Sequence, residues 1–80
     1  MFTIEEAKYI ADYVAEMLEC LDELMAEPKD DFNDGQILAY LHVLRTIQGN
    51  IFNDDVKKYL WLDIDLDKKY LNHPRKKKLQ

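Results

Sequence analysis

This sequence contains few of the residues that hold small disulfide-linked, metal-bound or loop-rich proteins together. Its 80 residues include a single cysteine, Cys20, so no disulfide can form within the chain. The two histidines, His42 and His73, are far apart and lack the spacing of metal ligands. Only two glycines and two prolines occur, whereas 48% of the residues are hydrophobic. This composition predicts one domain made of helices, with no metal and no cofactor.

The sequence also lacks the segments that direct a protein into or across a membrane. No hydrophobic run approaches the ~20 residues that cross a membrane, and the first residues do not have the pattern of a signal peptide. We therefore expect no contact with a membrane. A lone cysteine is typical of proteins in reducing compartments, which predicts a cytoplasmic location.

Basic residues are scarce except at the end of the sequence. Residues 1–74 carry all 16 acidic side chains but only seven of the 11 Lys and Arg, a formal charge of −9. Because nucleic-acid affinity comes largely from neutralising phosphates, this charge argues against direct nucleic-acid binding. Residues 1–74 are expected to form one helical domain, and residues 75–80 a solvated basic tail. The tail contains Arg75, Lys76, Lys77 and Lys78.

The first expected helix covers residues 4–26. Thr3 and Glu6 have the spacing of a capping box, and Glu5 adds negative charge where the helix dipole favours it. Apolar residues then recur every three or four positions, with no glycine or proline until Pro28, which ends the helix. At 1.5 Å per residue, this helix is roughly 34 Å long.

A second helix is expected at residues 34–48, after a polar connection at residues 27–34. Asp31, Asn33 or Asp34 can cap its start, and the pair of residues 49–50, Gly-Asn, is a typical helix stop. Its apolar residues also recur every three or four positions. Two amphipathic helices with a short connection pack antiparallel, which predicts a helical hairpin.

The third segment, from Asn53 to Pro74, fits two interpretations. Between residues 59 and 66, apolar residues occupy every second position, which is typical of a half-buried strand. As a helix, the segment has a broad apolar face that Asp63 and Asp67 interrupt. We favour the helix, because a lone strand needs a partner and no other segment offers one. The expected fold is all-α: an antiparallel hairpin with a third element across it, assembling as a helical bundle.

The residues capable of chemistry do not form a recognisable catalytic or metal motif. Cys20 has acidic neighbours, which disfavour the reactive thiolate, so we interpret it as structural. Asp63, Asp65 and Asp67 have the spacing that opens an EF-hand loop, but the glycine required at its sixth position is Lys68. We therefore predict neither calcium binding nor enzyme activity.

The first helix carries a large excess of acid, with eight acidic side chains and one lysine in residues 1–27. Most of the acids lie opposite the apolar face, which predicts an anionic surface for a basic site on another protein. Alternatively, the acidity only keeps an apolar-rich protein in solution. Tyr9 and Trp61 are expected to be aromatic anchors, and Tyr40 and Tyr59 to lie in the core. The predicted partner-binding residues are Glu5, Tyr9, Asp12, Glu16, Glu19, Glu23 and Trp61.

The apolar face of the first helix spans roughly 200°, which is wider than the arc that one neighbouring helix covers. A domain of this size also buries only ~60% of the surface that its unfolded chain exposes. Pairing two hairpins would bury the remaining apolar surface, which predicts a homodimer. The expected oligomer interface consists of Ile10, Val14, Met17, Leu21 and Leu24.

The stretch GQILAYLHVLRTIQGN, residues 35–50, resembles the second helix of small uncharacterised helical proteins found on phages and mobile elements of Gram-positive bacteria. The resemblance implies a phage-type accessory protein or inhibitor that acts by binding a host protein. Two function classes follow. The first is a protein-binding module whose acidic surface occupies a basic site on its partner. The second is a structural or regulatory homo-oligomer whose basic tail is its only recognition element.

Overall fold

All regular elements of the structure, a computed structural model that describes residues 3–71, are helical. In chain order they are the α-helices α1 (Ile4–Ala26), α2 (Asp31–Gly49) and α3 (Asp54–Tyr59), and a π-helical turn, η1 (Asp67–Leu71). The predicted all-α class is confirmed. The basic tail predicted at residues 75–80 lies outside the described residues.

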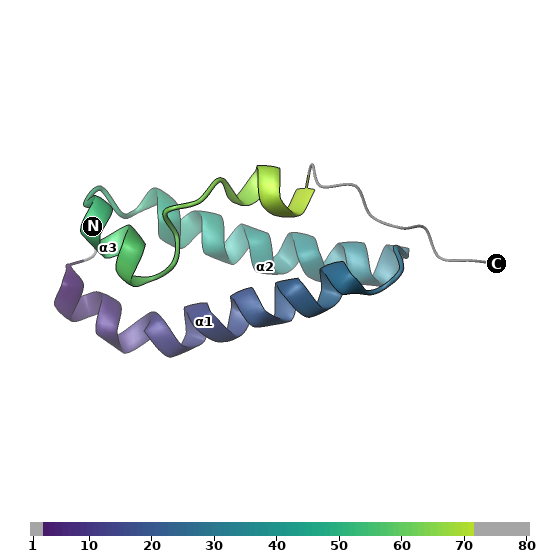
Figure 1. Cartoon of the computed structure of the whole chain (residues 1–80), viewed down its shortest axis with the longest axis horizontal. Coiled ribbons are helices and arrows are strands. Elements are labelled where there is room, and N and C mark those ends of the chain that lie inside the picture. Colours follow the sequence, from purple (N-terminus) through teal and green to yellow (C-terminus); the bar gives the residue numbers. More distant parts are fainter. Residues whose placement is uncertain (1–2, 72–80) are drawn as a thin grey trace.

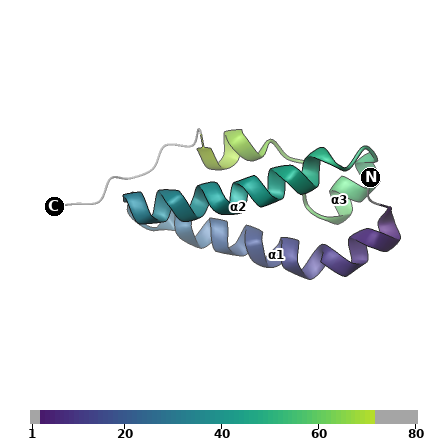
Figure 2. The ribbon, with the colours of Figure 1, turned by 180° about the vertical axis from the view of Figure 1, so that it is seen from behind.

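The two long helices, α1 and α2, lie side by side and run in opposite directions, which is the predicted hairpin (Figure 1). Residues 54–71 pack along one side of it, where α3 contacts α1 and η1 contacts α2 (Figure 2). One hydrophobic core joins the three parts. It consists of Ala7, Val14, Leu21, Ile37, Leu41, Leu44, Ile51, Val56, Leu60, Leu62, Leu66 and Tyr70.

The first helix, α1, has the predicted bounds, and the capping box sets its start. The Glu6 backbone N–H donates to Thr3 Oγ1 at 3.2 Å, and the Thr3 N–H donates to Glu6 Oε1 at 3.1 Å. These bonds satisfy two amide groups that the start of a helix leaves without partners. At the other end, Pro28 follows two positions after the last helical residue, Ala26.

The second helix, α2, begins three residues earlier than predicted. Its N-cap is Asp30, whose carboxylate accepts a hydrogen bond from the Asn33 backbone N–H at 2.8 Å. Several Asp and Asn residues in this stretch are good caps by type, but the capping residue must also have an extended backbone. Asp30 has one, with φ −149° and ψ 168°. The connection between the two long helices is therefore only residues 27–30.

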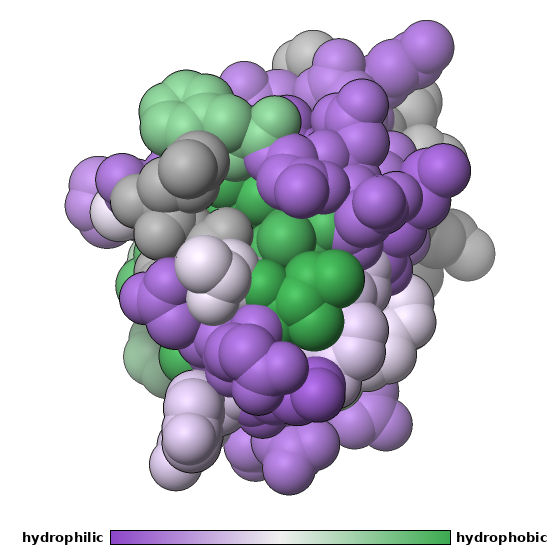
Figure 3. Space-filling view, turned by 90° about the vertical axis from the view of Figure 1, so that its left-hand side faces the viewer, coloured by the Kyte–Doolittle hydropathy of each residue, from purple (hydrophilic) through white to green (hydrophobic). Residues whose placement is uncertain are grey.

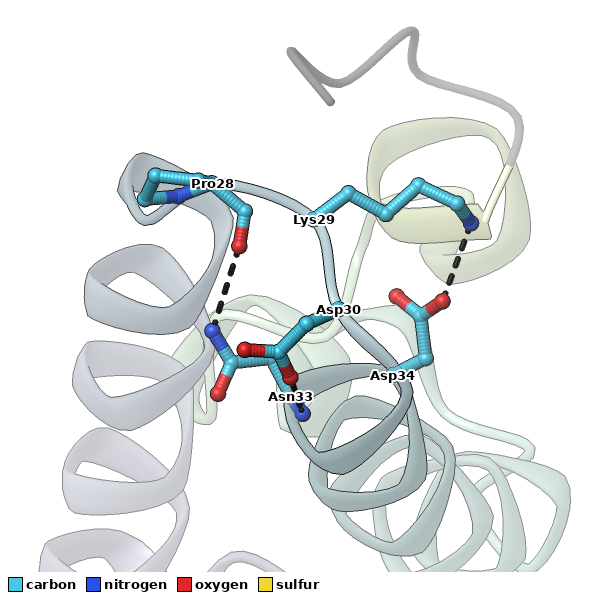
Figure 4. A network of polar contacts seen from close by, with 5 residues as sticks. All are labelled: Pro28, Lys29, Asp30, Asn33 and Asp34. Carbon is cyan, nitrogen blue, oxygen red and sulfur yellow. Dashed lines mark hydrogen bonds and ion pairs between the residues drawn. The ribbon is translucent and has the colours of Figure 1, made fainter. Parts of the chain in front are cut away.

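Asn33, one of the expected caps, instead ties the connection to the hairpin (Figure 4). Its side chain is buried, and Nδ2 donates to Glu27 Oε2 at 2.8 Å and to the Pro28 carbonyl at 3.3 Å. Lys29 Nζ forms an ion pair with Asp34 Oδ2 at 2.9 Å. These contacts hold the connection against the first turn of α2 and so fix where the two helices meet.

The third segment differs from the helix predicted for it. Its helical part, α3, ends at Tyr59, and residues 60–65 form neither a helix nor a strand. Burial nevertheless alternates, because Leu60 and Leu62 are buried whereas Trp61 and Asp63 are exposed. The expected helix is therefore wrong for residues 60–65, and the half-buried strand that an apolar period of two is typical of does not form there either.

A side chain of α2 takes the place of the missing partner strand. Gln48 Nε2 donates two hydrogen bonds to this segment, one to the Leu62 carbonyl at 2.9 Å and one to the Ile64 carbonyl at 2.8 Å. Buried carbonyl groups need such partners, because an unpaired one costs ~1–3 kcal/mol. One amide group therefore holds a segment that is neither helix nor strand on the hairpin.

The end of the molecule formed by the start of α1, the end of α2 and α3 exposes a hydrophobic area among hydrophilic side chains (Figure 3). Ile4 and Phe52 are exposed large hydrophobic residues of these parts of the chain. Ile51, next to Phe52, belongs to the core. The core therefore approaches the surface at this end.

Candidate interaction surface

The outer side of α1 carries the acidic residues that the sequence places opposite the core. Five of them share one face of the helix, and we call them the acidic stripe: Glu5, Asp12, Glu16, Glu19 and Glu23. All five are exposed. From the first to the last, the stripe covers roughly 27 Å at 1.5 Å per residue.

Only one basic side chain lies on α1, and it pairs with one end of the stripe. Lys8 Nζ is 3.6 Å from Glu5 Oε1, and both side chains are mostly exposed, so the pair contributes at most ~1 kcal/mol. Within residues 3–71, no ion pair joins the other four carboxylates to a basic side chain. The fold therefore leaves the stripe almost uncompensated.

Two exposed tyrosines lie beside the stripe. Tyr9 is 82% exposed, as predicted, and Tyr13 is 67% exposed. Tyr13 is about 100° around the helix from the fully buried Val14, beyond the arc that the core covers. Tyr59, predicted in the core, is 41% exposed because α3 ends there, and Tyr40 is half-buried.

Next to the stripe, α1 and the third segment border a hollow of about 410 Å³, which we call the Trp61 hollow. Trp61 is 53% exposed and lines it together with Ile64, while Leu18 lines it from α1. Glu19, a member of the stripe, also lines the hollow. The hollow and the stripe therefore form one continuous surface.

The position of Trp61 depends on how α3 ends. Its backbone is left-handed, with φ 58°, the conformation that glycine usually adopts after a helix. The Trp61 N–H donates to the Lys58 carbonyl at 3.1 Å and the Leu62 N–H to the Lys57 carbonyl at 2.8 Å, which is the Schellman pattern. A residue other than glycine in this conformation costs ~1–2 kcal/mol. Trp61 therefore occupies a backbone conformation that favours glycine.

The charged residues of the Trp61 hollow come from three parts of the chain. Glu19 and Asp22 belong to α1, Asp63 to the segment between α3 and η1, and Lys69 to η1. The Asp22 carboxylate accepts a hydrogen bond from the Tyr70 hydroxyl at 3.0 Å. Among the described residues, the carboxylates of Glu19 and Asp63 have neither an ion pair nor a hydrogen bond from a side chain. These two carboxylates are the acceptors left for a ligand.

Tyr70 and Asp67 fasten η1 to the two long helices. The Tyr70 ring is buried, and this burial, followed by the hydrogen bond to Asp22, raises the pKa of its hydroxyl above the ordinary 10.0. The hydroxyl therefore remains a hydrogen-bond donor at neutral pH. On the other side, Arg45 Nη1 lies 3.1 Å from Asp67 Oδ1. Both contacts help to fix the segment that carries Trp61.

Sequence reasoning does not identify Asp22, Asp63, Lys69 or Tyr70 as residues of one site. Tyr70 and Asp22 are 48 positions apart and meet only because the third segment folds back along the hairpin. The usable signal is the apolar period of two at residues 59–66. This alternation separates the buried Leu60 and Leu62 from the exposed Trp61 and Asp63.

A second hollow, of about 330 Å³, lies between α1 and α2, and its lining residues are Tyr13, Glu16, Met17, Cys20 and Tyr40. The pKa of Tyr40 is raised, first of all by its side-chain hydrogen bond with Cys20. The negative charge of Glu16, which lines the same hollow, also raises the pKa of Tyr40.

The five residues predicted to form an oligomer interface lie in two different environments. Val14 and Leu21 are completely buried within the single chain, so they have no surface for a second copy, and the prediction must be corrected for them. The apolar period marks a face of the helix but does not show which part of it the chain itself covers. Ile10, Met17 and Leu24 are only half-buried, at the edge of the core.

The described residues show no arrangement suited to a metal ion. Within residues 3–71, no group of three or more His, Cys, Asp or Glu side chains could hold one. Two of the regularly spaced aspartates have other roles, because Asp65 Oδ1 accepts from the Lys68 backbone N–H at 3.1 Å and Asp67 pairs with Arg45. In the same part of the chain, no helix is both long enough and apolar enough to cross a membrane.

Comparisons with known proteins give no match for this chain. No protein-family model matches the sequence, and no curated protein and no solved structure matches it significantly. Any function must therefore be inferred from the surface that the fold presents.

Proposed function

We propose that this protein is a binding module, without chemistry of its own, whose acidic stripe docks on a basic site of another protein. One observation carries the proposal. Four exposed carboxylates lie along a single long helix, and no ion pair compensates them within residues 3–71. Tyr9 at one edge of the stripe and Trp61 at the other are the aromatic anchors that such a contact would use.

Folding does not call for this charge. Asp12 and Glu16 are four residues apart, and so are Glu19 and Glu23, and each such like-charge pair destabilises a helix by about 0.2–0.5 kcal/mol. A face with mixed charges would be solvated equally well. A stripe of one sign, in contrast, steers a basic partner and raises the association rate, most strongly at low salt.

The resemblance of residues 35–50 to phage and mobile-element proteins favours a host protein as the partner and inhibition as the consequence. A row of negative charges resembles a phosphate backbone, so a basic site that normally receives nucleic acid is a suitable target. Residues 3–71 have 16 acidic and seven basic side chains, which opposes binding to nucleic acid itself. The lone cysteine supports a site of action in the cytoplasm.

The proposal is tested by selecting peptides from a displayed random library on the immobilised full chain. We expect the enriched peptides to be rich in Arg and Lys, with affinities that fall as salt rises. The stripe variant Asp12→Asn, Glu16→Gln, Glu23→Gln leaves the Trp61 hollow unchanged. It should fold normally by circular dichroism and bind these peptides at least roughly tenfold more weakly.

A matched control removes the same charge from other elements. Asp31→Asn, Asp55→Asn and Asp65→Asn together neutralise three exposed aspartates outside α1. This control should retain affinity within about twofold, because its charges lie away from the stripe and are screened by salt. Equal losses in the two variants would show that net charge alone attracts the peptides. Enrichment of neutral or acidic peptides would contradict the proposal outright.

A second candidate function, a homo-oligomer, is favoured by the edge of the core between α1 and α2. Ile10, Met17 and Leu24 are half-buried there, and Tyr40 and Ile47 are half-buried on α2. Two hairpins packed through these residues would form a four-helix bundle. Light scattering tests this candidate, because it requires a dimer mass that Met17→Glu lowers to the monomer. A monomer at micromolar concentration would exclude it.

A further inference from the structure

We propose that the Trp61 hollow receives an arginine side chain of the partner protein. This inference rests on the proposed function and adds the chemistry of one contact. The hollow joins the acidic stripe at Glu19, so a protein docked on the stripe brings its neighbouring side chains to the hollow. With a volume of about 410 Å³, the hollow is large enough for one long side chain.

The indole of Trp61 supplies a surface on which a guanidinium group can stack. Tryptophan is the best of the aromatic residues at binding cations over its ring, and arginine stacks well because its charged group is planar. Trp61 is about half exposed and borders the hollow. Leu18 and Ile64 add apolar surface for the aliphatic part of the arginine side chain.

Two carboxylates on different elements supply the negative charge. Glu19 and Asp63 are exposed, line the hollow and have no ion pair within residues 3–71. Asp22 also lines it, but its carboxylate already accepts the Tyr70 hydroxyl. A guanidinium group has five N–H donors in a fixed fork and can bond to carboxylates on two sides, whereas an ammonium group is a point charge. The hollow therefore favours arginine over lysine.

The wall of the hollow already accommodates a cation that belongs to the chain. Lys69 Nζ lies 5.1 Å from the centre of the Tyr70 ring, within the range of a cation–π contact, and both residues line the hollow. One positive charge of the chain thus lies beside this wall. The same charge repels an incoming guanidinium group, so Lys69 competes with the proposed ligand.

The experiment uses Trp61 as the reporter, because it is the only tryptophan and its fluorescence responds to binding in the hollow. The probe is the blocked peptide Gly-Arg-Gly-Arg-Gly, titrated into the full chain and compared with its lysine and citrulline versions. We expect a saturable change in Trp61 fluorescence with the arginine peptide. The lysine peptide should bind at least roughly threefold more weakly. Citrulline keeps the shape but lacks the charge, so its peptide should give no saturable change.

Substitutions then locate the contact. Asp63→Asn should weaken binding of the arginine peptide at least roughly fivefold, and Lys69→Ala should strengthen it. Asp31→Asn removes the same charge from an exposed residue of α2, outside both the acidic stripe and the hollow, and should weaken binding less than about twofold. All three variants retain Trp61, so the readout is unchanged.

Two outcomes would overturn the arginine site. One is a citrulline peptide that binds as well as the arginine peptide, and the other is an equal effect of Asp63→Asn and Asp31→Asn. Either result leaves the acidic stripe intact as a docking surface. The stripe itself fails only if its neutralised variant keeps its affinity for the library-selected basic peptides, which is a separate measurement.

Discussion

The two long helices of the hairpin are alike on the inside and different on the outside. Towards the core, Val14 and Leu21 of α1 and Leu41 of α2 are all completely buried. Towards solvent, α1 presents the acidic stripe, whereas residues 35–49 of α2 include one charged side chain, Arg45. That arginine is paired with η1.

The outer face of α2 shows that a helix of this hairpin folds with few charged residues on its exposed side. Phe32 and Val43 are exposed there, as are the uncharged Ala39 and Thr46, and α2 still packs as one uninterrupted helix. Because α2 folds with a largely uncharged outer face, the acidic residues on the outer face of α1 are not required for folding. This difference supports a role for the stripe in binding.

The largest effects should come from the inner faces, and they should be similar in both helices. Leu21→Ala and Leu41→Ala each remove a fully buried side chain, so each should lower the free energy of unfolding by ~2–5 kcal/mol. Urea denaturation followed by circular dichroism measures both. If either substitution lowered the free energy of unfolding by less than about 1 kcal/mol, the two inner faces would not contribute equally to stability.

A smaller loss of stability should follow removal of the Gln48 side-chain amide, which holds the segment between α3 and η1. Gln48→Ala leaves the Leu62 and Ile64 carbonyls without their donor and should cost ~1–3 kcal/mol. Gln36→Ala is the control, because Gln36 is half-buried on the same helix and has no side-chain hydrogen bond to a described residue. Its effect should stay within ~0.5 kcal/mol. Equal effects in urea denaturation would show that the two hydrogen bonds do not hold the segment.

Substitutions of Trp61, which follows the end of α3, should change the stability according to how well the new residue adopts a left-handed backbone. Trp61→Gly and Trp61→Ala both remove the indole, so their difference reports the cost of the left-handed backbone at φ 58°. We expect the glycine variant to be more stable by ~1 kcal/mol, as measured from the two urea midpoints. Equal stability of the two variants would mean that residue 61 leaves the left-handed conformation when the indole is removed.

The smallest effect should have the opposite sign. The double substitution Asp12→Asn, Glu16→Gln removes one like-charge pair from the exterior of α1 and should raise the free energy of unfolding by about 0.2–0.5 kcal/mol. Thermal melts at low salt, where charge repulsion is strongest, make the change measurable. A clear loss of stability would show that the acidic stripe supports the fold, contrary to the comparison with α2.

Local signals in the sequence predict the hairpin well. The bounds of α1 follow from the Thr3–Glu6 capping box and from Pro28, all of which act within a few residues. The start of α2 is predicted less well, because several neighbouring residues can cap a helix and only the backbone at Asp30 decides among them. The exposure of the stripe and of Tyr9 also follows from the helical period.

The third segment could not be predicted in the same way, because its structure depends on contacts between distant residues. The Gln48 side chain, 14 positions before Leu62, supplies the hydrogen bond that holds this segment on the hairpin. The Trp61 hollow depends in addition on a left-handed residue that is not glycine, which sequence rules do not anticipate. The site residues contributed by this segment therefore emerge only from the fold.

The central claim is that the exterior of α1 serves binding, whereas its interior serves folding. The association rate of a selected basic peptide, measured by stopped-flow fluorescence of Trp61 at increasing salt, tests this claim most directly. We predict a rate that falls roughly tenfold or more between low and high salt for the natural sequence. For the stripe variant Asp12→Asn, Glu16→Gln, Glu23→Gln we predict a slower rate with little dependence on salt. The same salt dependence in both proteins would contradict the claim.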